Sequence, residues 1–237
     1  SAPSNKKTIV IPEDYSAYLS DDYATLASNF ESDLSFWEQK LNEQPHSVTF
    51  KSKVAGLLSK QFRETGNVQD LLRSDEILNS AINTKLGQAG IYQALSANAI
   101  TQHNFLEARD YASKAFAIGE NKYVSSFLLF DANLELGDYE MAEAYLALQA
   151  NKSTFDYLIR AAKLQDVYGD LDQAIDLMEQ AKDRVSDNEE LYIWSISNLA
   201  DMYGHAGEIE KSYNAYLEVL AINPNHYHSL EGIAWVA

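Results

Sequence analysis

Apolar side chains recur along the chain with the spacing of α-helices. Near the N-terminus they stand mostly three or four residues apart, at Tyr23, Leu26, Ala27, Phe30, Leu34, Trp37 and Leu41. This spacing gathers them on one face of a helix. Pro45 follows the stripe and ends the helix. We therefore predict a helix within residues 23–47 whose apolar stripe covers the exposed face of the elements that follow.

A second pattern is a turn phrase that occurs five times. An apolar helix ends at a small residue, a polar helix starter follows, and a helix rich in alanine begins, as in Leu136-Gly137-Asp138-Tyr139. The phrase is centred on positions 66, 103, 137, 169 and 207, which by subtraction lie 37, 34, 32 and 38 residues apart. A period of this length is typical of stacked repeats.

The turn phrase has a physical meaning. Glycine adopts the left-handed conformation that ends a helix, and the Asp or Asn after it caps the next helix. Asn104 and Glu107 have the spacing of a capping box. At position 103 a histidine replaces glycine, and we expect the neighbouring Asn104 to accommodate the turn. A turn this short folds two helices into an antiparallel hairpin, which buries its apolar faces only when neighbours stack on it.

These residues resemble the tetratricopeptide repeat (TPR), with its 34-residue helix–turn–helix unit. The resemblance covers about residues 48–237. In the last complete repeat the signature positions hold Ile196, Leu199, Ala200, Tyr203, Ser212, Tyr216, Val219 and Pro224. It implies an all-α fold, a right-handed α-solenoid of antiparallel helix hairpins (a TPR-like superhelix) with an N-terminal capping helix. The Phe-Trp cap helix and the turn Phe62-Arg63-Glu64-Thr65-Gly66 are also similar to bacterial envelope-associated TPR proteins.

The patterns divide the chain into four segments. Residues 1–22 form a flexible or extended leader, in which Ile9 to Tyr18 run extended or as a short helix against the cap. Residues 23–47 form the capping helix, and residues 48–225 form five TPR-like hairpins. Residues 226–237 form the first helix of a sixth repeat, which either is truncated or serves as the cap of the solenoid.

Composition and charge narrow the functional classes. The 237 residues include no cysteine, which removes disulfides, thiolate metal sites and cysteine nucleophiles. The net charge of −17 opposes binding to nucleic acid or anionic lipid. No apolar run is long enough for membrane insertion of the folded domain. The absence of cysteine suits a bacterial cell envelope location, periplasmic or lipid-anchored after signal removal; the alternative is cytoplasmic.

No motif indicates catalysis or a cofactor. The chain has no HExxH, GxGxxG, GxxxxGK[ST] or GxSxG pattern. His226 and His228 are two residues apart at an expected helix start, and we interpret them as polar loop residues rather than metal ligands. We therefore predict no catalytic, cofactor-binding or metal site, and a protein that is not an enzyme.

The TPR resemblance implies that the first helices of the hairpins line a concave groove. Counting from the turns places there, besides His228, the candidate binding residues Lys53, Lys60, Arg63, Gln93, Phe127, Asp131, Asp156, Lys163, Asp166, Trp194, Asp201, His205, Glu231 and Trp235. The predicted groove is basic at one end, apolar around Phe127, and acidic with two tryptophans at the other end. The alternative for Phe127, Trp194 and Trp235 is that they pack against neighbouring helices.

The groove predicts a non-catalytic protein–protein interaction scaffold that binds a peptide or protein segment. Residues 120–237 carry 21 acidic and 7 basic side chains, which favours a partner with basic and hydrophobic residues. One alternative is binding of a small ligand or oligosaccharide through the groove aromatics. Another is a purely structural or oligomerisation module. The sequence leaves the oligomeric state open.

Overall fold

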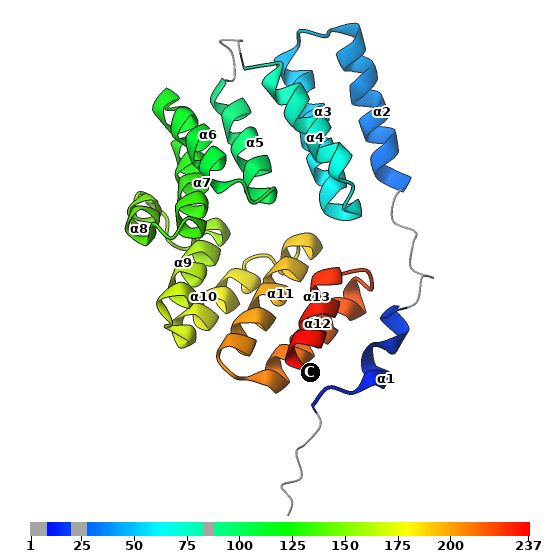
Figure 1. The fold of residues 1–237 in the computed structure, drawn as a ribbon, viewed down its shortest axis with the longest axis vertical. Coiled ribbons are helices and arrows are strands. Elements are labelled where there is room, and N and C mark those ends of the chain that lie inside the picture. The colour runs from blue at the N-terminus through cyan, green and yellow to red at the C-terminus, as the bar shows by residue number, and fades with distance from the viewer. Residues whose placement is uncertain (1–8, 20–27, 83–87) are drawn as a thin grey trace, which may run out of the picture. The chain divides into compact units, whose positions relative to one another are not determined.

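The computed structural model describes residues 9–19, 28–82 and 88–237, and within them the chain is all-α (Figure 1). Two short elements come first, α1 (Pro12–Tyr15) and the 3₁₀ helix η1 (Ser16–Leu19). The longer helices are α2 (Ser28–Glu43), α3 (Val48–Thr65), α4 (Val68–Asn79), α5 (Gln88–Thr101), α6 (Phe105–Ile118), α7 (Lys122–Glu135), α8 (Tyr139–Ala147), α9 (Phe155–Tyr168), α10 (Leu171–Asp183), α11 (Glu189–His205), α12 (Ile209–Ile222) and α13 (Tyr227–Val236).

The chain forms two compact units. Thr25–Ala150 makes up the first, here called the α2–α8 unit. The second, the α9–α13 unit, combines Asn151–Ala237 with the N-terminal Ser1–Ala24. The prediction that Ile9–Tyr18 lies against the capping helix was therefore wrong. The side chains Ile9, Val10, Tyr15 and Tyr18 of this segment pack against the apolar cluster of α11, α12 and α13.

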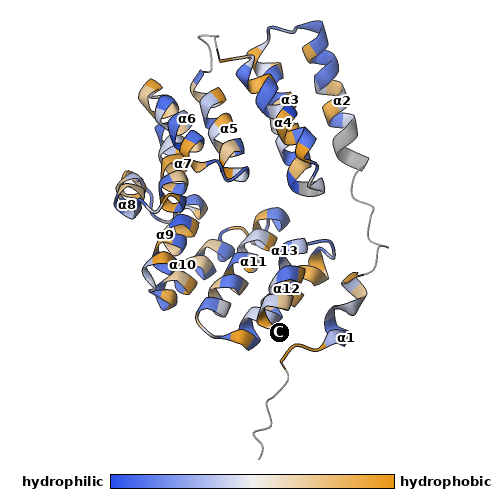
Figure 2. Ribbon diagram, viewed as in Figure 1, coloured by the Kyte–Doolittle hydropathy of each residue, from blue (hydrophilic) through white to orange (hydrophobic). Residues whose placement is uncertain are grey.

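Within each unit, helices that are consecutive in the chain pack as antiparallel hairpins, as predicted. Polar and apolar residues are interspersed along the helices (Figure 2). Alanines lie in the buried interfaces between helices. Ala108, Ala142 and Ala174 are completely buried, and a larger side chain at any of these positions would push the helices apart.

The turns have the predicted chemistry. Gly137 has a φ of +78°, and the backbone N–H of Asp138 donates to the carbonyl of Asn133 at 2.9 Å. The Asp138 carboxylate then accepts a hydrogen bond from the backbone N–H of Met141. One hydrogen bond therefore ends the first helix and the other begins the second.

The turn at position 103 differs from the prediction. His103 itself takes the left-handed conformation, with a φ of +57°, whereas Asn104 has a φ of −92°. The Asn104 side chain does not cap the helix backbone; its Nδ2 donates to Glu107 Oε2 at 2.6 Å. The capping box expected here is therefore replaced by a side-chain pair. His103 therefore has the same left-handed conformation as the glycine at the corresponding position of the other four turns.

The capping helix α2 covers α3. Trp37 packs against Phe50, with ring centroids 5.8 Å apart, and Lys53 Nζ lies 5.9 Å from the Trp37 ring centroid. Tyr23, Leu26 and Ala27, at the start of the predicted stripe, lie outside the described residues, and Phe30 belongs to the part of α2 whose side chains are not described.

Candidate functional site

An open pocket of about 280 Å³ lies between the last three helices of the α9–α13 unit. Helix α11 contributes two of its lining residues one turn apart, α13 contributes one face, and α12 contributes a buried tyrosine. The lining residues are Asp201, His205, Tyr216, His228, Glu231, Gly232 and Trp235.

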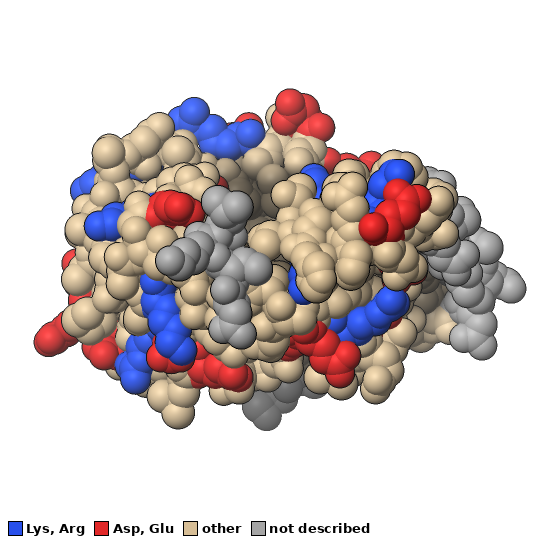
Figure 3. Space-filling view, turned by 90° about the horizontal axis from the view of Figure 1, so that it is seen from above, with Lys and Arg blue, Asp and Glu red and all other residues tan. Residues whose placement is uncertain are grey.

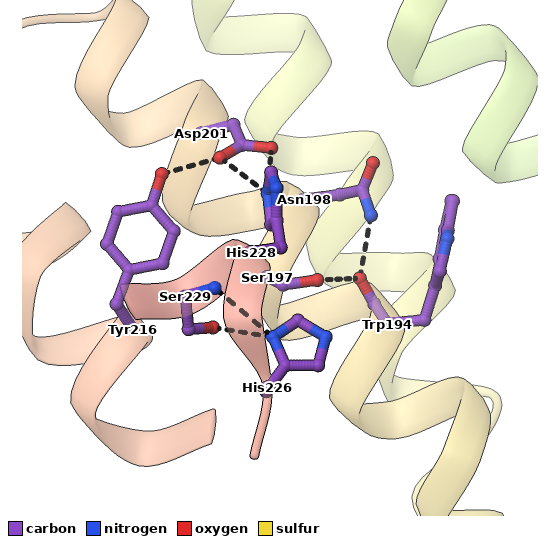
Figure 4. Close-up of polar contacts among 8 residues, drawn as sticks. All are labelled: Trp194, Ser197, Asn198, Asp201, Tyr216, His226, His228 and Ser229. Carbon is purple, nitrogen blue, oxygen red and sulfur yellow. Dashed lines mark hydrogen bonds and ion pairs between the residues drawn. The ribbon is translucent and has the colours of Figure 1, made fainter. Parts of the chain in front are cut away.

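Asp201 is the polar centre of the pocket (Figure 4). Its Oδ1 accepts a hydrogen bond from the Tyr216 hydroxyl at 2.5 Å. Its two carboxylate oxygens also lie 3.1 and 3.0 Å from Nε2 of His228, which comes from α13. One carboxylate thereby joins α11, α12 and α13, so it positions side chains from all three helices around the pocket.

The protonation of these groups follows from their surroundings. Burial raises the pKa of Tyr216, and its hydrogen bond to the Asp201 carboxylate raises it further, so the phenol stays protonated and donates. The hydrogen bond to Asp201 raises the pKa of His228 above 6.5, although burial opposes this, and the charge of Glu231 adds to the rise. The pocket thus favours a positive charge at the imidazole.

His226 has a different role from its neighbour. Its Nδ1 accepts a hydrogen bond from the backbone N–H of Ser229 at 3.3 Å, and the Ser229 hydroxyl lies 2.9 Å from the same nitrogen. Burial lowers the pKa of His226, and the nearby His228 lowers it further. Neutral His226 therefore caps the N-terminus of α13, and the interpretation of the pair as polar loop residues was incomplete.

The rim of the pocket carries an exposed aromatic ring. Trp235 is 56% exposed, and its ring meets that of His205 edge-on, with centroids 5.7 Å apart. His205 Nδ1 lies 3.0 Å from Asp166 Oδ1 on α9. The first helices of two successive hairpins, α9 and α11, and the helix α13 that follows them thus contribute to this one surface, here called the first-helix face.

Comparison with known proteins identifies the fold. Neither a protein-family profile nor a curated protein matches the chain. Among solved structures, PilW, a widely conserved type IV pilus biogenesis factor, is 17% identical, with a TM-score of 0.60 over 85% of this chain and 90% of its own. A chain of the APC/C hetero-tetramer Cut9–Hcn1 is 14% identical, with a TM-score of 0.67 over 87% of this chain and 39% of its own. TTC0263, a thermophilic TPR protein in Thermus thermophilus, is 14% identical, with a TM-score of 0.53 over 87% of this chain and 98% of its own.

The chain has the TPR fold. At these identities the likeness shows the fold and nothing of the ligands. TPR folds are typical of protein–protein interaction scaffolds and are usually non-catalytic. In the described residues, no group of three or more His, Asp or Glu side chains is arranged to hold a metal ion. No described helix combines the length and the hydropathy needed to cross a membrane.

The structure brings six of the sequence-predicted TPR groove residues together. In or beside the pocket lie Asp166, Asp201, His205, His228, Glu231 and Trp235. Lys163 and Trp194 lie on the same helices, α9 and α11, and pair with each other, with Lys163 Nζ 5.8 Å from the indole centroid. Trp194 is half-buried and also meets Phe155 edge-on, so it offers less surface to a ligand than Trp235 does.

Other predicted residues of the TPR groove are engaged in internal contacts. Phe127 is only 7% exposed, so the alternative in which it packs against neighbouring helices is the one that the structure has. Gln93 Nε2 donates to Ser125 Oγ at 2.9 Å. Asp156 is exposed and forms an ion pair with Arg160 of the same helix, α9, at 3.8 Å. Lys60 and Asp131 are half-buried, and Arg63 is exposed. Basic and acidic side chains are interspersed on the face shown in Figure 3. The predicted groove, basic at one end and acidic at the other, would include residues of both units, and it stays a prediction.

Two pocket residues were absent from the sequence-predicted set. Tyr216 occupies a TPR signature position, and such positions indicate core packing; indeed its ring is completely buried. Its hydroxyl reaches Asp201 only because α12 packs across α11. Gly232 carries no side chain and leaves no chemical signal in the sequence. It lines the pocket because α13 passes close to the Tyr216 ring.

Proposed function

We propose that this TPR protein is a non-catalytic scaffold that binds a peptide or protein segment on the first-helix face of the α9–α13 unit. The observation that carries the proposal is the open pocket beside an exposed tryptophan, Trp235, with two carboxylates, Asp201 and Glu231, in its lining. Exposed aromatic rings beside a pocket are frequent anchors of peptide ligands.

The charge of the site favours a partner with basic and hydrophobic residues. Residues 151–237 carry 15 acidic and 6 basic side chains, which attract and orient a cationic segment. In the pocket, Glu231 is exposed and available to a lysine or arginine side chain. The indole of Trp235 offers an apolar face and a cation–π surface to the same ligand. Location in a bacterial cell envelope stays a prediction.

A peptide selection tests this function. The full chain would be used to select binders from a random peptide library, and selected peptides would be titrated by isothermal calorimetry against Trp235→Ala and Glu231→Gln. We expect basic, apolar peptides to be selected, and Trp235→Ala to weaken them by at least about tenfold. Glu231→Gln should weaken lysine- or arginine-containing peptides and leave neutral ones unchanged.

The matched control is Tyr227→Ala. Tyr227 lies on the same helix, α13, is 74% exposed and does not line the pocket, so its loss should leave affinity unchanged. Equal effects of Trp235→Ala and Tyr227→Ala would overturn the proposal. A glycan panel followed by tryptophan fluorescence separates the alternative function, because a Trp235-dependent glycan response in the absence of selected peptides would favour small-ligand binding instead.

A further inference from the structure

The N-terminal residues 9–19, here called the clasp, pack on a second surface of the α9–α13 unit. Apolar side chains of the clasp, Ile9, Val10, Tyr15 and Tyr18, pack against the cluster formed by α11, α12 and α13. Figure 1 shows α1 beside α12 and α13. The contacts join residues about 200 positions apart in the sequence. A segment near the N-terminus thus covers a surface formed by helices near the C-terminus.

Tyr213 on α12 makes polar contacts with the clasp. Its Oη accepts a hydrogen bond from the backbone N–H of Ile11 at 3.1 Å. The same hydroxyl can donate to Asp14 Oδ2 at 3.0 Å or to the Ile11 carbonyl at 3.2 Å. Tyr213 is itself buried. The hydroxyl therefore recognises an extended backbone position followed by a carboxylate, which is the kind of contact that a peptide-binding surface makes.

One side of the clasp is half-buried and the other side is exposed, as in a bound peptide. Ile9, Val10, Tyr15 and Tyr18 are half-buried, whereas the intervening Pro12, Glu13 and Asp14 and the following Ser16 and Ala17 are exposed. Ile11 is extended, with a φ of −115°, and Pro12 then opens a single helical turn. Half-burial of these four side chains and the hydrogen bonds to Tyr213 offset the conformational entropy that ordering the segment costs. Such a small balance suits a segment that detaches and rebinds.

We propose that Tyr213, together with the apolar cluster of α11, α12 and α13 against which the clasp packs, forms a second peptide-docking site, and that the clasp is its releasable occupant in cis. The clasp defines the class of ligand, which is a short peptide. Such a peptide begins with aliphatic residues, as at Ile9 and Val10, and continues with one extended residue. A helical turn that starts at proline follows, and it carries an acidic residue and tyrosines in and after the turn. Tyr213, which binds the clasp, does not line the first-helix pocket, which Tyr216 serves from the same helix.

The experiment uses a fluorescent synthetic peptide of residues 9–19 and the full chain. Tethering gives the cis segment a high effective concentration, so the wild-type protein should bind the peptide weakly. Two full-length variants weaken the clasp independently. Tyr15→Ala with Tyr18→Ala removes two packed rings. Ile11→Pro removes the N–H that donates to Tyr213 and requires a φ that Ile11 does not have.

We expect each clasp-weakened variant to bind the peptide at least about tenfold more tightly than the wild type, because less of the site is occupied in cis. Adding Tyr213→Phe to either variant should reverse the gain, and a scrambled peptide should not bind. Tyr123→Ala with Tyr227→Ala is the matched control, since both tyrosines are exposed and neither belongs to the apolar cluster that the clasp covers; it should bind as the wild type does. Failure of the peptide to bind either weakened variant, or binding that is equal in all proteins or insensitive to Tyr213→Phe, would overturn the proposal.

Discussion

The phenol ring of Tyr216 occupies the space that a side chain at Gly232 would need. A Cβ atom built on Gly232 would overlap Tyr216 Cζ and Cε1 and would lie 2.7 Å from Cε2. The ring is completely buried and its hydroxyl is held by Asp201, so it has nowhere to move. The close approach of α13 to α12, and with it the floor of the pocket, depends on this pair.

Gly232→Ala should therefore destabilise the protein. Overpacking of a buried site costs about 1–3 kcal/mol, and the better helix propensity of alanine returns at most about 1 kcal/mol. We expect a net loss of roughly 1–2 kcal/mol in the free energy of unfolding, measured by urea titration. The peptide affinity of the first-helix pocket should fall as well.

Gly204→Ala is the matched comparison. A Cβ there would overlap Trp235 Cζ3, but Trp235 is mostly exposed and can rotate away. Its stability should stay within about 0.5 kcal/mol of the wild type, while the tryptophan emission spectrum shifts. Equal destabilisation by the two substitutions would contradict the difference in ring mobility on which the prediction depends.

His226, which caps α13, and His228 within it should have opposite effects on stability as the pH changes. The pKa of His228 is raised in the folded state, so its contribution is present below the unfolded value of 6.5 and is lost as the pH rises through the folded pKa. The pKa of His226 is lowered, so its contribution is present above 6.5 and is lost as the pH falls through the folded pKa.

Substitutions separate the two contributions. The stability lost in His228→Gln should be larger at about pH 5.5 than at about pH 8. His226→Asn keeps a capping acceptor but removes the titration, and its stability relative to the wild type should improve as the pH falls. NMR titration provides the direct check, with midpoints expected above 6.5 for His228 and below it for His226. Identical midpoints would refute the assignment.

A buried amide should hold together three helices of the α2–α8 unit. Asn98 on α5 donates from Nδ2 to Ser74 Oγ at 2.9 Å and to Asp75 Oδ1 at 2.7 Å, both on α4. Its Oδ1 accepts from Ser59 Oγ of α3 at 2.9 Å. Asn98→Leu keeps the branched shape of the side chain but removes its three hydrogen bonds, so it should cost at least about 2 kcal/mol in urea unfolding.

Thr101→Ala serves as the control for Asn98→Leu. Thr101 is an exposed residue of the same helix, and its hydroxyl donates to the carbonyl of Ala97 at 3.0 Å, one turn earlier. Its loss should cost no more than about 0.5 kcal/mol, because water can replace this exposed hydrogen bond. If the two variants were equally stable, the buried network would contribute nothing measurable.

His103→Gly should stabilise the protein. A non-glycine residue in the left-handed region costs about 1–2 kcal/mol, and the extra freedom of glycine in the unfolded chain takes back about 0.5–1 kcal/mol. We expect a net gain of roughly 0.5–1 kcal/mol by thermal or urea unfolding. Asn104→Gly should instead destabilise, because φ is −92° at that position. The reverse outcome would place the left-handed residue at Asn104, as the sequence alone suggested.

Features of the fold that depend on neighbouring residues were predictable. The hairpin at Gly137 and Asp138 follows from one glycine in the left-handed conformation and one capping carboxylate. Both can be predicted from two adjacent residues of the sequence. The TPR resemblance placed Trp235 and Asp201 on one face, and the structure brings them into one pocket. The clasp had no such local signal. Its partner Tyr213 is remote in sequence, and apolar side chains on a short segment do not specify which apolar surface they will cover.

The sequence by itself determined the all-α hairpin architecture, the position of the turns and the faces of the helices, because helix periodicity, glycine conformation and capping act over a few residues. Only the tertiary structure decided which side chains meet. Asp201 joins Tyr216 to His228, Phe127 is enclosed and Trp235 is exposed, because these outcomes depend on the distances and angles between packed helices. Helix packing is a property of whole surfaces in contact, and no local pattern of residues encodes it.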